Sequence, residues 1–158
     1  MKVAEGSPVP TFTLPDADEQ VVSDASLRGR WVVLYFYPKD DTSGCTVEAC
    51  EFRDDIPRFD GVNATVLGVS PDPPKSHRKF RDKYDLNFTL LADEDHSLAE
   101  EFGVWKEKSM YGRKYWGIER STFLIDPSGV VRKVWRQVKA RGHAEEVGIA
   151  LTELIQGG

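Results

Sequence analysis

Long apolar runs alternate with amphipathic segments along most of this chain. Residues 31–37 form an uninterrupted apolar and β-prone run, which predicts a central strand covered on both faces. Residues 64–70 predict a second buried strand of the same kind. Between these runs, apolar side chains recur at helical spacing over residues 45–59. The first half of the chain therefore predicts a strand, a crossover helix and a second strand.

The remaining segments continue this order to the end of the chain. Helices are predicted at 74–84, 96–102 and 143–155, further strands at 11–14, 88–91, 121–125 and 130–135, and a long polar and aromatic loop at 103–117. The turn Asp-Pro-Ser-Gly at 126–129 predicts that the last two strands form a hairpin. The whole order predicts a single α/β domain over residues 1–158, with a mixed central sheet flanked by helices and an N-terminal β extension. A thioredoxin-like fold fits this order.

Composition narrows the classes of partner. The chain has 158 residues and a formal net charge of -5, from 21 basic and 26 acidic side chains. A general nucleic-acid binder needs a concentrated basic surface, so we expect no nucleic-acid partner. The longest apolar run has seven residues, against the roughly 20 that span a bilayer, and the N-terminus shows no secretory pattern. We therefore expect no membrane partner and a cytoplasmic location.

The chain has only two cysteines, which are too few for a disulfide scaffold, so a bond between them is expected to be transient and chemical. Cys45 falls where a buried strand passes into a helix, and unpaired backbone N–H groups and the helix dipole favour an anion such as a thiolate there. Gly44 lets the backbone approach a small oxygen ligand, and the Thr42 hydroxyl can turn inward to form a hydrogen bond. By position alone, Cys45 is equally well a small buried hydrophobe, Thr42 a helix cap and Gly44 a turn residue.

Cys50 lies five positions after Cys45, on the same predicted helix. In an intact helix this spacing places the two Cα atoms roughly 8.6 Å apart, on directions that differ by about 140°. A disulfide requires a Cα separation below about 7 Å. Both cysteines can therefore serve one redox cycle only if the first turns of the helix unwind after Cys45 is oxidised.

The residues around Cys45 resemble a known family. The spacing of Pro38, Thr42 and Cys45 is the Pro-x-x-x-Thr-x-x-Cys motif of the peroxiredoxins, and the wider segment is similar to the peroxiredoxin Q or bacterioferritin comigratory protein subfamily. Three segments carry the resemblance, which extends over nearly the whole chain: 6–14, 37–53 and 117–126. Ser43 stands where the subfamily often has proline, a departure that removes no reacting group.

The resemblance implies a role for each of these residues. Cys45 would be the peroxidatic cysteine, which attacks a peroxide oxygen and becomes a sulfenic acid. Cys50 would be the resolving cysteine, Thr42 would bind and orient the peroxide together with Gly44, and Pro38 would shield the sulfur from water. Arg120 would be the active-site arginine, whose permanent charge stabilises the thiolate and polarises the leaving oxygen. Without the resemblance, Arg120 is better interpreted as a surface strand charge.

The implied activity is that of an atypical 2-Cys peroxiredoxin. Hydrogen peroxide or an organic hydroperoxide would oxidise Cys45, Cys50 would close an intramolecular disulfide with it, and thioredoxin or glutaredoxin would reduce the pair. Sulfur carries both electrons, so no cofactor or metal is expected, and the resemblance suggests a monomer. A general disulfide oxidoreductase is disfavoured because that chemistry usually uses Cys-x-x-Cys. A redox-sensing protein that uses the same cysteine pair remains an alternative.

Other chemistry-bearing residues stay open from the sequence alone. The three histidines lack metal-ligand spacing with either cysteine, which argues against a zinc site. Glu48 could join a hydrogen-bond network with an arginine or simply favour the start of the helix. Tyr111, Tyr115 and Trp116 either line the mouth of the active site or pack the predicted loop.

Overall fold

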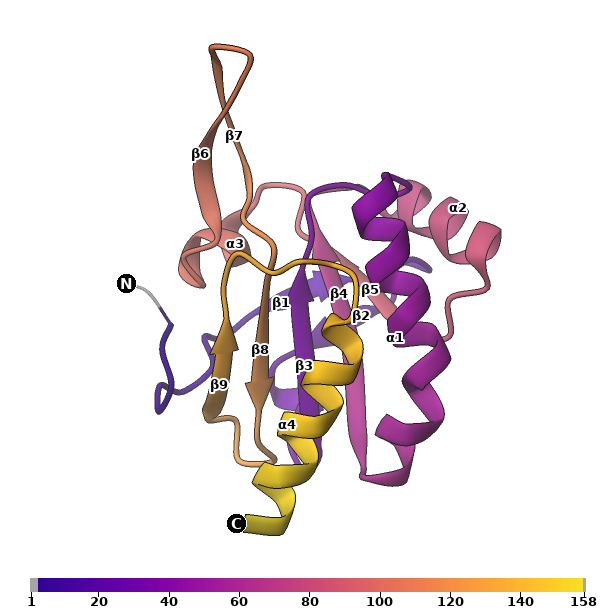
Figure 1. Cartoon of the computed structure of the whole chain (residues 1–158), viewed down its shortest axis with the longest axis vertical. Coiled ribbons are helices and arrows are strands. Elements are labelled where there is room, and N and C mark those ends of the chain that lie inside the picture. The colour runs from indigo at the N-terminus through magenta and orange to yellow at the C-terminus, as the bar shows by residue number, and fades with distance from the viewer. Residues whose placement is uncertain (1–2, 158) are drawn as a thin grey trace.

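The structure is a computed structural model that describes residues 3–157. Its central sheet consists of five strands: β3 (Trp31–Phe36), β4 (Ala64–Ser70), β5 (Thr89–Ala92), β8 (Ser121–Ile125) and β9 (Val131–Trp135). They lie in the order β5-β4-β3-β8-β9 (Figure 1). Strand β3 pairs in parallel with β4 and antiparallel with β8, so the predicted mixed sheet is confirmed.

Four α-helices accompany the sheet in the described residues: α1 (Ser43–Gly61), α2 (Pro74–Tyr84), α3 (Ser97–Glu101) and α4 (His143–Gly157). A short 3-10 helix, η1 (Ala25–Leu27), precedes β3. Helices α1 and α4 lie together over one face of the sheet (Figure 1). Within residues 3–157, no helix is both long enough and apolar enough to cross a lipid bilayer.

Two hydrophobic cores pack against opposite faces of the sheet, because successive strand residues point to opposite sides. Tyr35 of β3 points into the core beneath α1, where its ring stacks on that of Phe52 with centroids 4.7 Å apart. Leu34, its neighbour in sequence, points into the other core with Phe102 and Phe123. This burial on both sides explains why β3 is apolar at every position.

Helix α1 carries both cysteines and contains a proline. Pro57 has no N–H, so it cannot donate to the carbonyl of Arg53 one turn earlier. The side chain of Asn87 donates to that carbonyl instead, at 3.2 Å. The helix therefore continues past the proline with its freed acceptor satisfied.

The N-terminal segment forms the expected β extension. Strands β1 (Thr13–Pro15) and β2 (Val21–Ser23) pair antiparallel, and Asp16 bridges to Leu91 of the central sheet. The Asp24 carboxylate accepts a hydrogen bond from the backbone N–H of Phe12 at 2.9 Å. The extension is thus tied both to itself and to the edge of the sheet.

The prediction of a loop at residues 103–117 is wrong. This segment folds into an antiparallel hairpin of β6 (Trp105–Met110) and β7 (Arg113–Ile118), which stands out from the body of the molecule (Figure 1). Both of its faces are largely exposed, so its strands lack the apolar alternation that marks a half-buried strand. Its turn consists of Tyr111 and Gly112, both with positive φ, as a two-residue type I′ turn requires.

Gly68 of β4 provides a test of the packing beneath α1. A Cβ at this position would lie 3.0 Å from Leu90 Cδ2 and 3.0 Å from the Tyr35 ring, which is held against Phe52. We expect Gly68→Ala to lower the free energy of unfolding by about 1–3 kcal/mol through overpacking. Urea denaturation of the reduced protein measures this change.

Gly61→Ala at the end of α1 is the matched control, because a Cβ there meets nothing within 4 Å. We expect this control to leave stability unchanged or to raise it by up to about 1 kcal/mol. Equal stability of the two variants would contradict the packing described for β3, β4 and β5.

Candidate active site

The candidate site forms where β3 ends and α1 begins. Cys45 lies in the first turn of α1 and is 2% exposed, within the core beneath that helix. Arg120 comes from a distant part of the chain, directly before Ser121. Because Ser121 pairs with Phe36 at the end of β3, the sheet register brings Arg120 beside the segment that leads to Cys45.

Arg120 contacts the sulfur directly. Its Nη2 donates a hydrogen bond to Cys45 Sγ at 3.3 Å. A Cβ on Gly44 would lie 3.1 Å from the same Nη2, so glycine at this position leaves room for the guanidinium. The guanidinium and the N-terminus of α1 both direct positive charge toward Cys45. The structure thus brings Cys45, Gly44 and Arg120 together, and their roles in catalysis stay a prediction.

Glu48 completes the contacts of this arginine. Arg120 Nη1 donates to Glu48 Oε1 at 2.6 Å, which identifies Glu48 as part of an arginine network. Glu48 is fully buried, and its Oε2 has no hydrogen-bond partner among the described residues. Burial raises the pKa of Glu48 to about 7, although the charge of Arg120 acts in the opposite direction. Glu48 therefore titrates near neutral pH. It and Cys45 both accept hydrogen bonds from the same guanidinium, that of Arg120.

Thr42 stands at the N-cap of α1 and is exposed. Its carbonyl accepts the N–H of Thr46 at 2.8 Å, but its hydroxyl makes no capping bond and donates to the carbonyl of Lys39 at 2.8 Å. With its proton used in this way, the hydroxyl offers lone pairs to a ligand beside Cys45. Pro38 follows β3 and is half-buried, and its role in shielding the sulfur stays a prediction.

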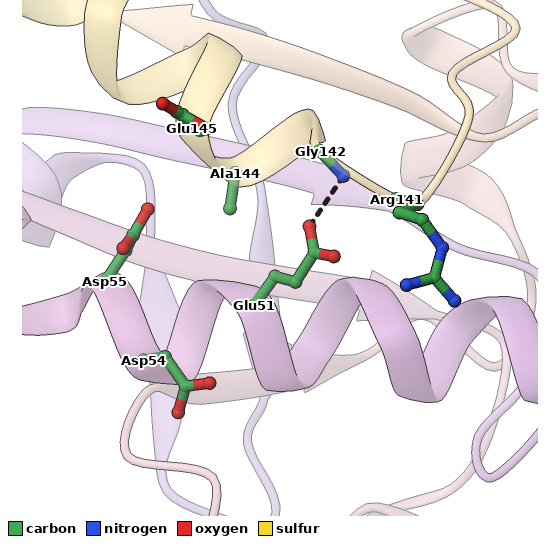
Figure 2. A pocket seen from close by; sticks show the side chains of 7 residues that line it. All are labelled: Glu51, Asp54, Asp55, Arg141, Gly142, Ala144 and Glu145. Atoms are coloured by element: carbon green, nitrogen blue, oxygen red, sulfur yellow. Dashed lines mark hydrogen bonds between the residues drawn. The ribbon is translucent and has the colours of Figure 1, made fainter.

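Cys50 is a half-buried free thiol in the same helix as Cys45, which is also free. The helix is fastened just beyond it, where Glu51 accepts a hydrogen bond from the backbone N–H of Gly142 at 2.8 Å. Figure 2 shows this bond in an acidic pocket between α1 and the start of α4. This bond attaches α1 to the segment before α4 just beyond Cys50.

A buried network anchors the loop before α1. His77 of α2 is fully buried, with Nδ1 2.8 Å from Asp40 Oδ2 and Nε2 2.9 Å from the carbonyl of Leu91. These two contacts hold the imidazole ring at both of its nitrogens. Tyr37 donates to the other Asp40 oxygen at 2.6 Å. Sequence reasoning did not find this network, because its members are far apart in the chain.

Lys108 is a second residue that sequence reasoning missed, because it belongs to the hairpin that was predicted to be a loop. It is half-buried, and its stem lies near Gly117, where a Cβ would be 3.6 Å from Lys108 Cδ. Burial lowers the pKa of Lys108, the charge of Arg120 lowers it further, and Cys45 raises it. Lys108 thus lies within electrostatic range of the reacting sulfur.

Across the described residues, no three His, Cys, Asp or Glu side chains gather into a group that could hold a metal ion. The candidate site itself offers a thiol with a cation beside it, a hydroxyl acceptor and a second thiol nearby in sequence. Such a site suits nucleophilic attack on a small, polarisable oxygen compound.

Comparison with known proteins agrees with this geometry. The sequence profile of the AhpC/TSA family matches residues 6–134. Peroxiredoxin Bcp of Bacillus subtilis is 47% identical over 156 residues, which cover 99% of each chain.

Solved structures extend the comparison to three dimensions. A cysteine-to-serine mutant of Xylella fastidiosa PrxQ superposes with a TM-score of 0.93 at 42% identity, covering 98% of this chain and 99% of that one. The bacterioferritin comigratory protein of Xanthomonas campestris, described for alkyl peroxide reduction activity, has a TM-score of 0.86 at 45% identity and covers 89% of this chain and 90% of that one. The predicted thioredoxin-like fold is thereby confirmed.

The buried Glu48 carboxyl predicts a pH dependence of stability. As the pH rises from 4.5, the ordinary pKa of a glutamate side chain, to about 7, an unfolded chain loses this proton and the folded protein keeps it. The contribution of Glu48 to stability is therefore greatest below pH 4.5 and is lost as the pH rises through 7, by about 3 kcal/mol in total. Glu48→Gln removes this loss, so the variant should gain stability relative to wild type as the pH rises.

Urea denaturation of the reduced proteins at pH 5 and pH 8 measures this difference. Glu101→Gln, which alters an exposed carboxyl at the end of α3, is the control and should differ from wild type by the same amount at both pH values. A Glu48→Gln difference that does not change with pH would show that the folded protein ionises Glu48 as readily as the unfolded chain.

Proposed function

This chain belongs to the AhpC/TSA family and, within it, to the peroxiredoxins, and we propose that it reduces hydrogen peroxide and organic hydroperoxides with Cys45 as the attacking thiolate. The observation that carries the proposal is the Arg120 hydrogen bond to Cys45 Sγ, at 3.3 Å and at a helix N-terminus. The extension to organic hydroperoxides is supported by the alkyl peroxide reduction described for the Xanthomonas relative.

In the first step, the Cys45 thiolate attacks the outer oxygen of the hydroperoxide. A sulfur–oxygen bond forms, the oxygen–oxygen bond breaks, and its electron pair leaves on the inner oxygen, which takes up a proton to give water or an alcohol. Sulfur loses two electrons and becomes a sulfenic acid. Arg120 lies beside the sulfur, where it can stabilise the negative charge that moves from sulfur to the leaving oxygen. The Thr42 hydroxyl can accept a hydrogen bond from the peroxide O–H and so help to align the reactants.

In the second step, the Cys50 thiol attacks the sulfenic sulfur of Cys45. A disulfide forms and water leaves. The folded helix holds the two residues too far apart for this step, so the turns between them must unwind. Oxidation itself favours the unwinding, because a neutral sulfenic acid no longer binds Arg120 and the helix N-terminus as an anion does.

In the third step, a dithiol protein returns two electrons to the disulfide. We propose thioredoxin or glutaredoxin for this role, which makes the chain an atypical 2-Cys peroxiredoxin. We also propose that it acts as a monomer and as one domain, and a cytoplasmic location stays a prediction from the sequence.

Peroxide consumption by the two cysteine variants tests the proposal. Cys45→Ser should lose about three orders of magnitude of activity or more, as other enzymes do without their nucleophile. With thioredoxin as reductant, Cys50→Ser should consume one equivalent of peroxide per chain and then stall, whereas dithiothreitol, a small external thiol, should reduce its sulfenic acid and sustain turnover. The assay uses hydrogen peroxide and cumene hydroperoxide, with dithiothreitol or a thioredoxin system as reductant.

Full activity of Cys45→Ser would refute Cys45 as the nucleophile. Sustained turnover of Cys50→Ser with thioredoxin, at the wild-type rate, would leave the first step intact and refute the resolving role of Cys50.

A further inference from the structure

The β6–β7 hairpin has two chemically different faces. In an antiparallel pair, residues directly opposite each other share a face. One face, here called the basic face, carries Lys106, Lys108, Met110, Arg113 and Tyr115. The opposite face carries Trp105, Glu107, Ser109, Lys114, Trp116 and Ile118. The only acidic side chain within the two strands therefore lies on the opposite face, and the basic face has none.

The basic face borders the active site. Its Lys108 lies within electrostatic range of Cys45 and Arg120, and the chain runs from the end of β7 through one residue into Arg120. The opposite face is anchored elsewhere at its base, where Trp105 stacks on His96 with centroids 4.0 Å apart and Ile118 is 1% exposed. The basic face is therefore the side of the hairpin that is turned toward Cys45 and Arg120.

Side chains near the tip of the hairpin are exposed to solvent. Tyr111 is 98% exposed, Met110 56% and Tyr115 42%. Neither Lys108 nor Arg113 forms an ion pair among residues 3–157, although the protein as a whole carries a net charge of -5. Exposed apolar side chains rimmed by unpaired charges of one sign are typical of a protein-binding surface.

The size of this surface matches a protein better than a peroxide. Two paired strands of six residues each extend about 20 Å, far beyond the two oxygens that react at Cys45. The hairpin also stands well clear of the sheet and of α1, so its outer half is open to a large partner (Figure 1). The protein that reduces the disulfide must place its own thiol against one of the two cysteine sulfurs, so it must bind close to them.

We propose that the basic face of the hairpin docks the dithiol protein that reduces the Cys45–Cys50 disulfide, and that this partner presents acidic and apolar side chains beside its dithiol. This inference rests on the proposed function, since it requires the disulfide to form. A thiolate of the docked partner attacks one sulfur of the disulfide, which frees the other cysteine and leaves a mixed disulfide. The second partner thiol then displaces the remaining cysteine, so the partner leaves oxidised and both cysteines of this chain are reduced.

The test compares reduction of the preformed disulfide by two reductants in stopped-flow fluorescence. Dithiothreitol is small and uncharged and reports the chemistry alone. Reduced thioredoxin of net negative charge reports chemistry and docking together. If dithiothreitol reduces no disulfide in the oxidised protein, the proposed function is contradicted. If a variant differs from wild type only in its rate with thioredoxin, the substitution acts on the docking surface.

Two matched pairs of variants separate the faces. Tyr115→Ser, on the basic face, should lower the second-order rate with thioredoxin by at least about fivefold, and Trp116→Ser, on the opposite face, by less than about twofold. Arg113→Glu should lower that rate by about five- to tenfold at low salt, and more than Lys114→Glu does. The effect of Arg113→Glu should shrink at about 0.5 M salt, where charges are screened within a few ångströms. All four variants should match wild type with dithiothreitol.

Three results would overturn the proposal. The first is equal loss in the two members of each pair, and the second is a parallel loss with dithiothreitol, which would place the effect in the chemistry. The third is a wild-type dimer in sedimentation that dissociates in Tyr115→Ser, which would assign the basic face to a second copy of this chain.

Discussion

The contact between Arg120 and Cys45 is the interaction on which the rest of the site depends. A single guanidinium donates to the sulfur at 3.3 Å and to the buried Glu48 at 2.6 Å. Both partners lie on the first turns of α1, so the arginine joins the helix start to the end of the adjacent sheet. Moving a charge out of water costs free energy. The contacts among Arg120, Cys45 and Glu48 offset this cost only while each of the three side chains keeps its partner. The same contact thus stabilises the thiolate and holds the helix that presents it.

The fold supplies this contact through register rather than through proximity in sequence. Antiparallel pairing of β8 with β3 sets Ser121 opposite Phe36, which brings Arg120 to the end of β3. The loop between β3 and α1 is fixed from the other side by the buried pair of Asp40 and His77. Glu51 fastens the helix to the segment before α4 just beyond Cys50, so we propose that the change on oxidation is confined to the first turns of α1, once Arg120 releases them. In this proposal, reactivity and local unfolding fall within the same few residues.

The sequence was most informative where burial or turn chemistry leaves a pattern. The apolar run at 31–37 and the turn at 126–129 predicted the central strand and the last hairpin correctly, because both reflect local constraints. Arg120 was assigned only through family resemblance, since nothing in a lone arginine on a strand end reveals that a sheet register will bring it to a distant cysteine. Glu48 was left with two roles for the same reason. The segment 103–117 was mistaken for a loop because both faces of this hairpin are largely exposed, so its strands lack the alternation of apolar and polar residues that marks a half-buried strand.

Amide hydrogen exchange of α1, measured in the reduced protein and in the Cys45–Cys50 disulfide form, tests the central claim most directly. We predict that amides from Thr46 to about Glu51 are protected in the reduced protein and lose protection in the disulfide form. Amides in the later part of α1 should stay protected in both forms, because Glu51 and Arg53 keep that part attached through Gly142 and the carbonyl of Tyr84. Equal protection of the first turns in the two forms would show that the disulfide forms without unwinding of α1.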